Sequence, residues 1–192
     1  MLYAGAYLLG SIPFSYLVVK LRTGKDVRTL GSGNVGATNA TRVAGKAAGL
    51  LAGLLDASKG VVAVLVARGL GAPPAVTGGV AFTAVLGHCF PIFLRFRGGK
   101  GGATGAGALA ILAPLATLLS VLVWFVVAAW KRYVSLGTVT AAASCPLFVL
   151  ALRRDEGPWL LLATAAIAAL IVVRHHSNLR RLFAGVERKI GQ

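Results

Sequence analysis

The chain has 192 residues, of which 57% are hydrophobic and only 13% charged, and its formal net charge is +15. Its mean hydropathy of +0.79 lies far outside the range of soluble domains, which excludes that class of protein. The apolar runs are continuous and longer than the strands of a membrane barrel, and only helices and closed barrels satisfy the backbone in lipid. We therefore expect one all-α integral membrane domain over residues 1–192.

Twenty Lys and Arg residues stand against only five acidic residues. The cations gather in short loops between apolar runs, which is the orientation signal of a membrane protein. No basic soluble module is left over, so we expect no nucleic-acid partner. Cys89 and Cys145 lie in apolar surroundings and predict neither a disulfide framework nor a metal site.

Six apolar runs follow one another along the chain, at a scale where about 20 residues make one helical span. Their bounds are Leu2–Val19, Ala47–Ala67, Ala75–Leu94, Ala103–Trp130, Val134–Leu152 and Pro158–Val173. The first run has no basic residues at its start and contains a polar break at Gly10–Ser15. We interpret it as a first span rather than as a cleaved signal peptide.

The cationic loops set the number of spans, because they should all lie on the cytoplasmic side. With six single spans, Lys131 and Arg132 would lie on the opposite side from the other cations. A break at Pro114 divides the fourth run and brings every cationic loop to one side. That run is too short for two full spans at about 1.5 Å per residue. We therefore predict a polytopic protein with seven transmembrane helices, the fourth or fifth short, with the N-terminus outside and the C-terminus cytoplasmic.

The second run carries Asp56 and Lys59, which are one helical turn apart on one face. Charges at such depth are costly, and they face either a functional cavity or each other. The sequence leaves both interpretations open: a functional pair, or a structural ion pair that fixes the packing of helices.

Two polar loops, Arg28–Arg42 and Arg95–Thr104, combine glycine, small polar residues and cations. Such loops present backbone N–H groups together with positive charge, which is what a phosphate needs. Arg42 can bind a phosphate through two hydrogen bonds, and Lys100 supplies a mobile point charge. The alternative is that both loops are tight turns between helices. The candidate phosphate-binding residues are Ser32, Gly33, Asn34, Gly36, Thr38, Asn39, Arg42, Gly98, Gly99, Lys100 and Gly101.

Neither loop predicts a nucleotide cofactor. Gly31–Gly36 matches G-x-G-x-x-G in letters, but the dinucleotide motif needs a preceding strand and a βαβ unit. Gly98–Gly101 is not a Walker A loop, because Leu94 stands where that motif has its first glycine. We expect no cofactor and no metal.

Polar residues near the ends of two other runs are further candidates. His175 and Asn178 follow the last run and share a face if the helix continues; the alternative is a cap at the membrane interface. His88 ends the third run, where it is either a functional group or a packed interface residue.

Several sequence blocks together carry a resemblance to a known family. On these blocks the chain resembles the bacterial acyl-phosphate:glycerol-3-phosphate acyltransferase family, and their spread from residue 10 to the C-terminus makes the resemblance cover nearly the whole chain. The blocks are Gly10–Leu17, Gly31–Asn39 with Arg42, Leu55–Gly60, Gly87–Pro91, Gly98–Gly101, Lys131–Ser135, and Arg174–His175 with Asn178.

The resemblance implies a seven-helix enzyme of the bacterial inner membrane with its active site facing the cytoplasm. Such an enzyme transfers a fatty acyl group from acyl phosphate to the 1-hydroxyl of glycerol 3-phosphate, giving 1-acyl-glycerol 3-phosphate (lysophosphatidic acid) and phosphate. This is the first step of phospholipid synthesis. The implied partners are the two substrates, the lipid bilayer and, through functional coupling, the soluble enzyme that makes acyl phosphate.

The residues can be given roles on this basis. Ser32, Arg42, Lys100 and backbone N–H groups would hold the phosphates, while His175 and Asn178 would orient the glycerol hydroxyls. The proton acceptor stays open between a substrate phosphate oxygen and three side chains, so the catalytic candidates are His175, Asn178, Asp56 and His88. A transporter of phosphorylated metabolites and a lipid-binding scaffold are the alternative functions, although the chain shows no internal repeat of the kind transporters have.

Overall fold

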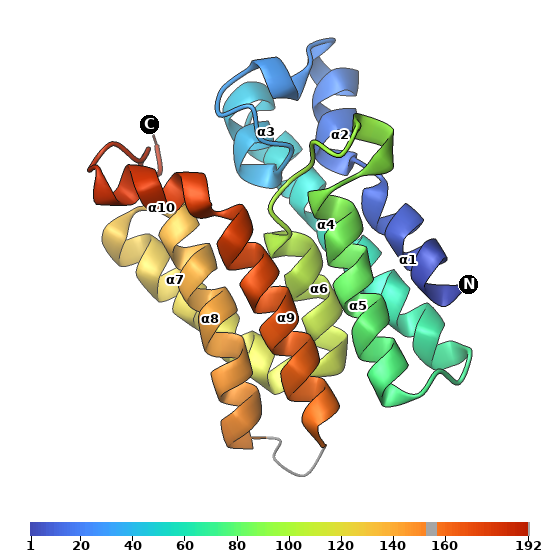
Figure 1. Cartoon of the computed structure of the whole chain (residues 1–192). Helices are drawn as coiled ribbons and strands as arrows, with labels where there is room; N and C mark the ends of the chain where they lie inside the picture. The colour runs from blue at the N-terminus through green and yellow to red at the C-terminus, as the bar shows by residue number, and fades with distance from the viewer. Residues whose placement is uncertain (153–156, 192) are drawn as a thin grey trace.

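The computed structural model describes residues 1–152 and 157–191, and all regular elements in them are helices (Figure 1). This confirms the predicted all-α fold. Two single 3₁₀ turns, η1 (Val27–Thr29) and η2 (Ile92–Leu94), lie in the connections. The α-helices are α1 (Leu2–Ser11), α2 (Phe14–Thr23), α3 (Ala37–Ala44), α4 (Lys46–Gly69), α5 (Pro74–Cys89), α6 (Gly102–Leu112), α7 (Pro114–Lys131), α8 (Val134–Leu152), α9 (Pro158–Arg174) and α10 (His176–Phe183).

Five segments of the described chain are long and apolar enough to cross a membrane: α1 with α2, α4, α5 with η2, α7 and α8. A sixth is obtained if α9 and α10, which are bent by 56° relative to each other, count as one. The fourth apolar run is divided where the sequence predicts, because α6 ends at Leu112 and α7 begins at Pro114. With 11 residues, α6 is the short member. The count of seven spans and the sidedness of the termini stay predictions.

The break between α1 and α2 lies at Ile12 and Pro13 and is stabilised by a buried ion pair from α4. Lys59 Nζ donates to the Ile12 carbonyl at 2.9 Å and lies 3.0 Å from Asp56 Oδ1. Ser15 Oγ donates to Asp56 Oδ2 at 2.8 Å. Since Asp56 and Lys59 are 1% and 2% exposed, each charge depends on the other and on the break that both contact.

The short helix α6 lies in the middle of the bundle and packs closely on α4 (Figure 1). Glycines on both helices permit this approach. A Cβ on Gly60 would lie 2.8 Å from the backbone N of Ala108, and a Cβ on Gly107 would lie 2.8 Å from the backbone carbonyl carbon of Ala57. The close contact fixes the N-terminus of α6 at the end of the bundle where α3 and α10 also lie.

Candidate active site

One cavity of about 680 Å³ joins the two polar loops, the C-terminal tail and the apolar space between α6, α7 and α8. Three of the predicted site residues, Gly33, Gly98 and Gly99, are outside its lining. The others line it: Ser32, Asn34, Gly36, Thr38, Asn39, Arg42, Asp56, His88, Lys100, Gly101, His175 and Asn178. Residues that are far apart in the sequence therefore form one site.

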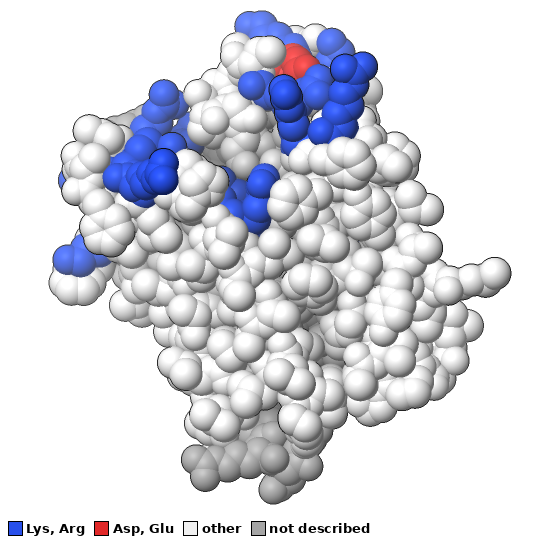
Figure 2. All heavy atoms as spheres, in the orientation of Figure 1, with Lys and Arg blue, Asp and Glu red and all other residues white. Residues whose placement is uncertain are grey.

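The polar end of the cavity is strongly cationic. Arg42, Lys100, Arg181 and Arg188 line it, whereas the acidic residues of its lining are Asp56 and Glu187. Figure 2 shows Lys and Arg side chains gathered at this end of the visible face, above a wide surface of uncharged residues. Such a concentration of positive charge in a hollow attracts anionic substrates.

In the first loop, the buried side chain of Asn39 holds the backbone in shape. Its Oδ1 accepts from the N–H of Ser32 at 2.9 Å, and its Nδ2 donates to the carbonyls of Val27, Leu30 and Asn34 at 3.0–3.1 Å. The carbonyl oxygen and the amino group of this side chain are therefore both bonded to the loop backbone. Asn39 fixes the conformation of the loop that carries Ser32.

The structure corrects the predicted extent of this loop. The sequence indicated a loop as far as Arg42, but α3 begins at Ala37, so that Thr38 and Arg42 project from a helix. Packing on α4 explains the difference: a Cβ on Gly49 would lie only 2.8 Å from Thr41 Cβ. Tertiary contact of this kind overrides the weak helix propensity of a segment rich in Thr and Asn.

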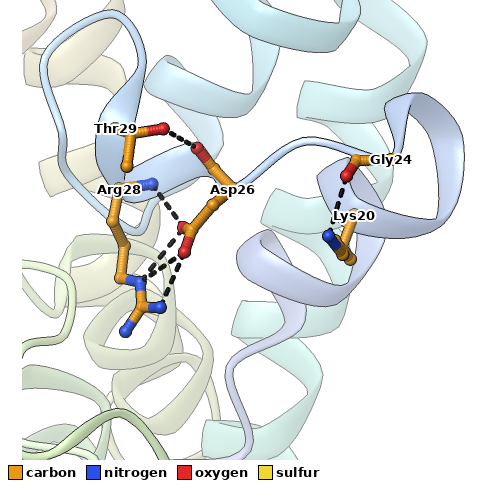
Figure 3. A network of polar contacts seen from close by, with 5 residues as sticks. All are labelled: Lys20, Gly24, Asp26, Arg28 and Thr29. Carbon is orange, nitrogen blue, oxygen red and sulfur yellow. Dashed lines mark hydrogen bonds and ion pairs between the residues drawn. The ribbon is translucent and has the colours of Figure 1, made fainter.

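Arg28, at the entrance to the first loop, is paired rather than available to a ligand. Figure 3 shows its guanidinium against Asp26, with Nη2 2.6 Å from Oδ2. The Asp26 carboxylate also accepts from the Arg28 N–H at 2.9 Å, and the Thr29 hydroxyl donates to the Asp26 carbonyl at 3.0 Å. By contrast, no hydrogen bond or ion pair joins the guanidinium of Arg42 to another residue of the described chain. Arg42 is the arginine of this segment that can receive a phosphate.

In the second loop, Gly98 and Gly99 are packing positions. The N–H of Gly99 donates to the His88 carbonyl at 3.1 Å, and a Cβ on Gly98 would lie 2.9 Å from the Cys89 carbonyl. From the end of α9, Arg174 donates to the Gly99 carbonyl at 3.1 and 3.2 Å and lies over the Phe90 ring, 4.8 Å from its centroid. The carbonyl of Gly99 is thus directed to a cation that is not part of the cavity lining.

The second loop leads directly into α6, and the N-terminus of this helix faces the cavity. Gly101 precedes it with φ = +83°, a left-handed conformation that favours glycine, and Gly101, Gly102 and Ala103 all line the cavity. The first N–H groups of a helix have no partner inside the helix and form a natural anion site. Lys100 directly precedes this turn.

We expect Arg174→Lys to raise the KM for a phosphate-bearing substrate about tenfold with a smaller change in kcat, because lysine loses the forked hydrogen bonds to the loop carbonyls. Steady-state kinetics in detergent measure this. Arg180→Lys, at an exposed position on α10, is the matched control and should leave both constants unchanged. Equal kinetics for the two variants would show that Arg174 does not position the loop.

The tail forms a hydrogen-bonded chain around Asn178. Its Oδ1 accepts from Lys100 Nζ, and its Nδ2 donates to Glu187 Oε1 at 2.5 Å. Glu187 also accepts from Ser135 Oγ at 2.7 Å and from Arg181 Nε at 2.6 Å. These bonds connect the Lys100 ammonium group, through Asn178, to the C-terminal tail.

Glu187 is the central acceptor of this hydrogen-bonded network, and neither it nor its partners Ser135 and Arg181 were predicted as site residues. The Glu187 side chain is 7% exposed, and its hydrogen bonds hold its pKa below the ordinary value although burial opposes the shift. One signal was available: Glu187 is the single acidic residue after Arg174 in a tail rich in cations.

His175 lies at the bend between α9 and α10 and is buried. The predicted shared face with Asn178 assumed a continuous helix; the helix breaks here, yet both residues line the cavity. His175 Nδ1 lies 2.7 Å from the Ile171 carbonyl. Because a carbonyl only accepts, Nδ1 carries the proton, and Nε2 retains its lone pair. His88 Nδ1 lies 3.5 Å from Asp56 Oδ1, so these two candidates form a pair at the cavity wall.

Burial and the neighbouring Arg181 lower the pKa of Lys100 to about 8. We expect kcat/KM for a phosphate-bearing substrate to fall as the pH rises through this value, because Lys100 loses its proton while the phosphate, whose second pKa is about 6, stays charged. A pH–rate profile measures this decline. Lys100→Arg should remove it, since arginine keeps its charge; a decline of the same midpoint in that variant would contradict the assignment.

Together, the fold and the cavity define a multi-pass membrane protein with a cationic, phosphate-binding type of site that continues into apolar space. The family model described as glycerol-3-phosphate acyltransferase matches residues 1–185. The chain belongs to this family, and it is therefore a membrane-integral glycerol-3-phosphate acyltransferase, an enzyme of phospholipid synthesis. This excludes the alternatives of a transporter and of a non-catalytic scaffold.

Individual relatives agree over the whole length. The chain is 44% identical to the glycerol-3-phosphate acyltransferase of Desulforamulus reducens, covering 100% of this chain and 95% of the relative. It is 48% identical to that of Trichlorobacter lovleyi, with 97% and 94% covered. The crystal structure of PlsY (YgiH), an integral membrane glycerol 3-phosphate acyltransferase, in its glycerol 3-phosphate form superposes with a TM-score of 0.93 at 43% identity, covering 99% of this chain and 94% of that one. Its lysophosphatidic acid form gives 0.90 at 41% identity, with the same shares covered.

Proposed function

We propose that this enzyme transfers the acyl group of acyl phosphate to the 1-hydroxyl of glycerol 3-phosphate, producing lysophosphatidic acid and phosphate. The observation that carries the proposal is the single cavity, whose cationic end has room for phosphate groups and whose other end is apolar. The crystal forms of PlsY with glycerol 3-phosphate and with lysophosphatidic acid support the acceptor and the product. The cationic end faces the cytoplasm of a bacterial inner membrane, where the soluble enzyme that makes acyl phosphate supplies the donor.

The phosphate groups are held by the two loops acting together. Arg42 approaches from α3, Lys100 approaches from the second loop, and the free N–H groups at the start of α6 lie between the loops and the bundle. Ser32 adds a hydroxyl donor. Hydrogen bonds from charged donors to phosphate are about twice as strong as neutral ones, so Arg42 and Lys100 supply most of the binding.

His175 and Asn178 orient the glycerol hydroxyls. The Nε2 lone pair of His175 is available as an acceptor because Nδ1 is bonded to the Ile171 carbonyl. Asn178 joins the hydroxyls to the phosphate site, because its side chain is the one that holds Lys100. A shared support of this kind fixes the acceptor hydroxyl relative to the phosphate of the same molecule.

In the reaction, the hydroxyl oxygen attacks the acyl carbonyl carbon, a new C–O ester bond forms, and the bond from that carbon to the phosphate oxygen breaks. The phosphate leaves with the electron pair, and the hydroxyl proton passes to a phosphate oxygen. Asp56 is a poor proton acceptor, because Lys59 and Ser15 already occupy its carboxylate. An acyl phosphate is an activated anhydride, so positioning and charge stabilisation supply most of the catalysis.

The proposed donor is tested with purified protein, glycerol 3-phosphate and either acyl phosphate or acyl-CoA of the same chain. Phosphate release and lysophosphatidic acid formation should be equal and should require both glycerol 3-phosphate and acyl phosphate. Ester formation from acyl-CoA alone, with no reaction of acyl phosphate, would contradict the proposal while leaving the family assignment intact.

A further inference from the structure

The apolar part of the cavity is a pocket with a closed end between α6, α7 and α8. Leu109, Thr117, Ser120 and Cys145 line this end, and each is between 2% and 6% exposed. Nearer the cationic end, Phe125 also lines the cavity and is 59% exposed. The cavity is therefore open at the side near the phosphate site and closed at depth.

The depth of the pocket corresponds to one layer of lipid chains. Ser135, which donates to Glu187 at the cationic end, and Cys145, at the closed end, both lie on α8 and both line the cavity. At about 1.5 Å per residue, the helix axis between them measures about 15 Å. The hydrocarbon core of a bilayer is about 30 Å thick, so one leaflet contributes about 15 Å, which equals this length.

The closed end is also unsuited to a chain that reaches beyond it. Thr117 Oγ1 is buried there without a hydrogen-bond partner in the described chain, and Ser120 Oγ donates to the Ala116 carbonyl at 2.8 Å. Both side chains are already buried, so a chain that reaches beyond this end would have to displace packed groups. On α8 the pocket is lined by small side chains, Ala141, Ala142 and Cys145, which leave its width free.

We propose that Leu109, Thr117 and Cys145 form a floor that sets the length of the acyl chain the enzyme accepts. This inference rests on the proposed function in one respect, that the acyl chain occupies the apolar end while the phosphates occupy the cationic end. A chain whose methyl terminus stops at the floor is fully buried. A longer chain must bend toward the side opening and loses burial of its last methylenes.

Two substitutions should move the chain-length preference in opposite directions. Cys145→Phe raises the floor, and we expect activity on the longest accepted acyl phosphates to fall about tenfold relative to donors two methylenes shorter. Leu109→Ala lowers the floor and should move the optimum to longer chains. Leu147→Phe, on the outer face of α8 with 64% of the side chain exposed, is the control and should keep the parental profile.

The experiment measures kcat/KM for a graded series of acyl phosphates, together with the binding of lysophosphatidic acids of the same chain lengths. The binding series uses lysophosphatidic acid and no acyl phosphate. It therefore still tests the floor if the proposed acyl donor is wrong. If Cys145→Phe does not fold, Ala142→Leu narrows the pocket in its place. Opposite shifts in the two pocket variants support the floor; a parallel loss at all chain lengths, or unchanged profiles, overturns it.

Discussion

Replacement of Lys100 with methionine is expected to reduce kcat/KM by about a hundredfold to a thousandfold, with the protein still folded. Methionine keeps much of the length of the lysine stem but removes the charge, and removal of one preorganised donor to a developing negative charge commonly costs about a hundredfold to a thousandfold. The Lys100 ammonium donates to Asn178 Oδ1, which fixes it at the cationic end of the cavity. The loss should be measured by phosphate release at saturating and at limiting glycerol 3-phosphate.

Lys25→Met is the matched control, because Lys25 is exposed at the same end of the molecule and outside the cavity. It removes the same unit of net charge from the cationic surface, and we expect less than a twofold change at moderate ionic strength, where screening acts over about 8 Å. Comparable losses in both variants would mean that the overall positive field, and not the position of Lys100, carries the effect.

Asp56→Ala is expected to lower the free energy of unfolding by about 3–5 kcal/mol, because it leaves Lys59 buried without its counter-charge. Asp56 also binds Ser15 and accepts at its backbone carbonyl from Thr104 Oγ1 at 2.8 Å, so α2, α4 and α6 meet at this residue. Thermal unfolding in detergent measures the loss. Ser58→Ala, exposed on the same helix, should be neutral.

The double variant Asp56→Ala with Lys59→Met separates structure from catalysis. Removal of both charges leaves no uncompensated ion, so most of the stability should return. If Asp56 acts only in packing, acyl transfer should return with it. A stable double variant without activity would show that the Asp56–Lys59 pair does more than stabilise the packing.

Hydropathy and cation placement predicted much of the architecture, because a bilayer imposes simple demands on a helix. The helical class follows because the backbone must satisfy its hydrogen bonds within the lipid, and the division at Pro114 follows because proline interrupts a helix. The beginning of α3 at Ala37 and the bend at His175 could not be predicted, since both arise from contacts between segments: Thr41 against Gly49, and the tail folded back through Glu187.

The sequence predicted the charged and glycine-rich residues of the site. It predicted fewer of the residues that hold these groups in position. Arg42, Lys100, His175 and Asn178 were identified from composition and resemblance and line one cavity. Arg174 was not assigned to the site by its pattern, because a cation after an apolar run usually marks the membrane interface. Only the folded chain brings its guanidinium to the Gly99 carbonyl.

We propose that the two polar loops bind the substrate phosphates and that the C-terminal tail orients the glycerol hydroxyls, all within one cavity. A structure of this enzyme with glycerol 3-phosphate bound tests it most directly. We predict the phosphate within hydrogen-bond distance of Arg42 and Lys100, and the glycerol hydroxyls next to His175 and Asn178. A phosphate bound elsewhere, with Lys100 still bonded only to Asn178, would contradict the account.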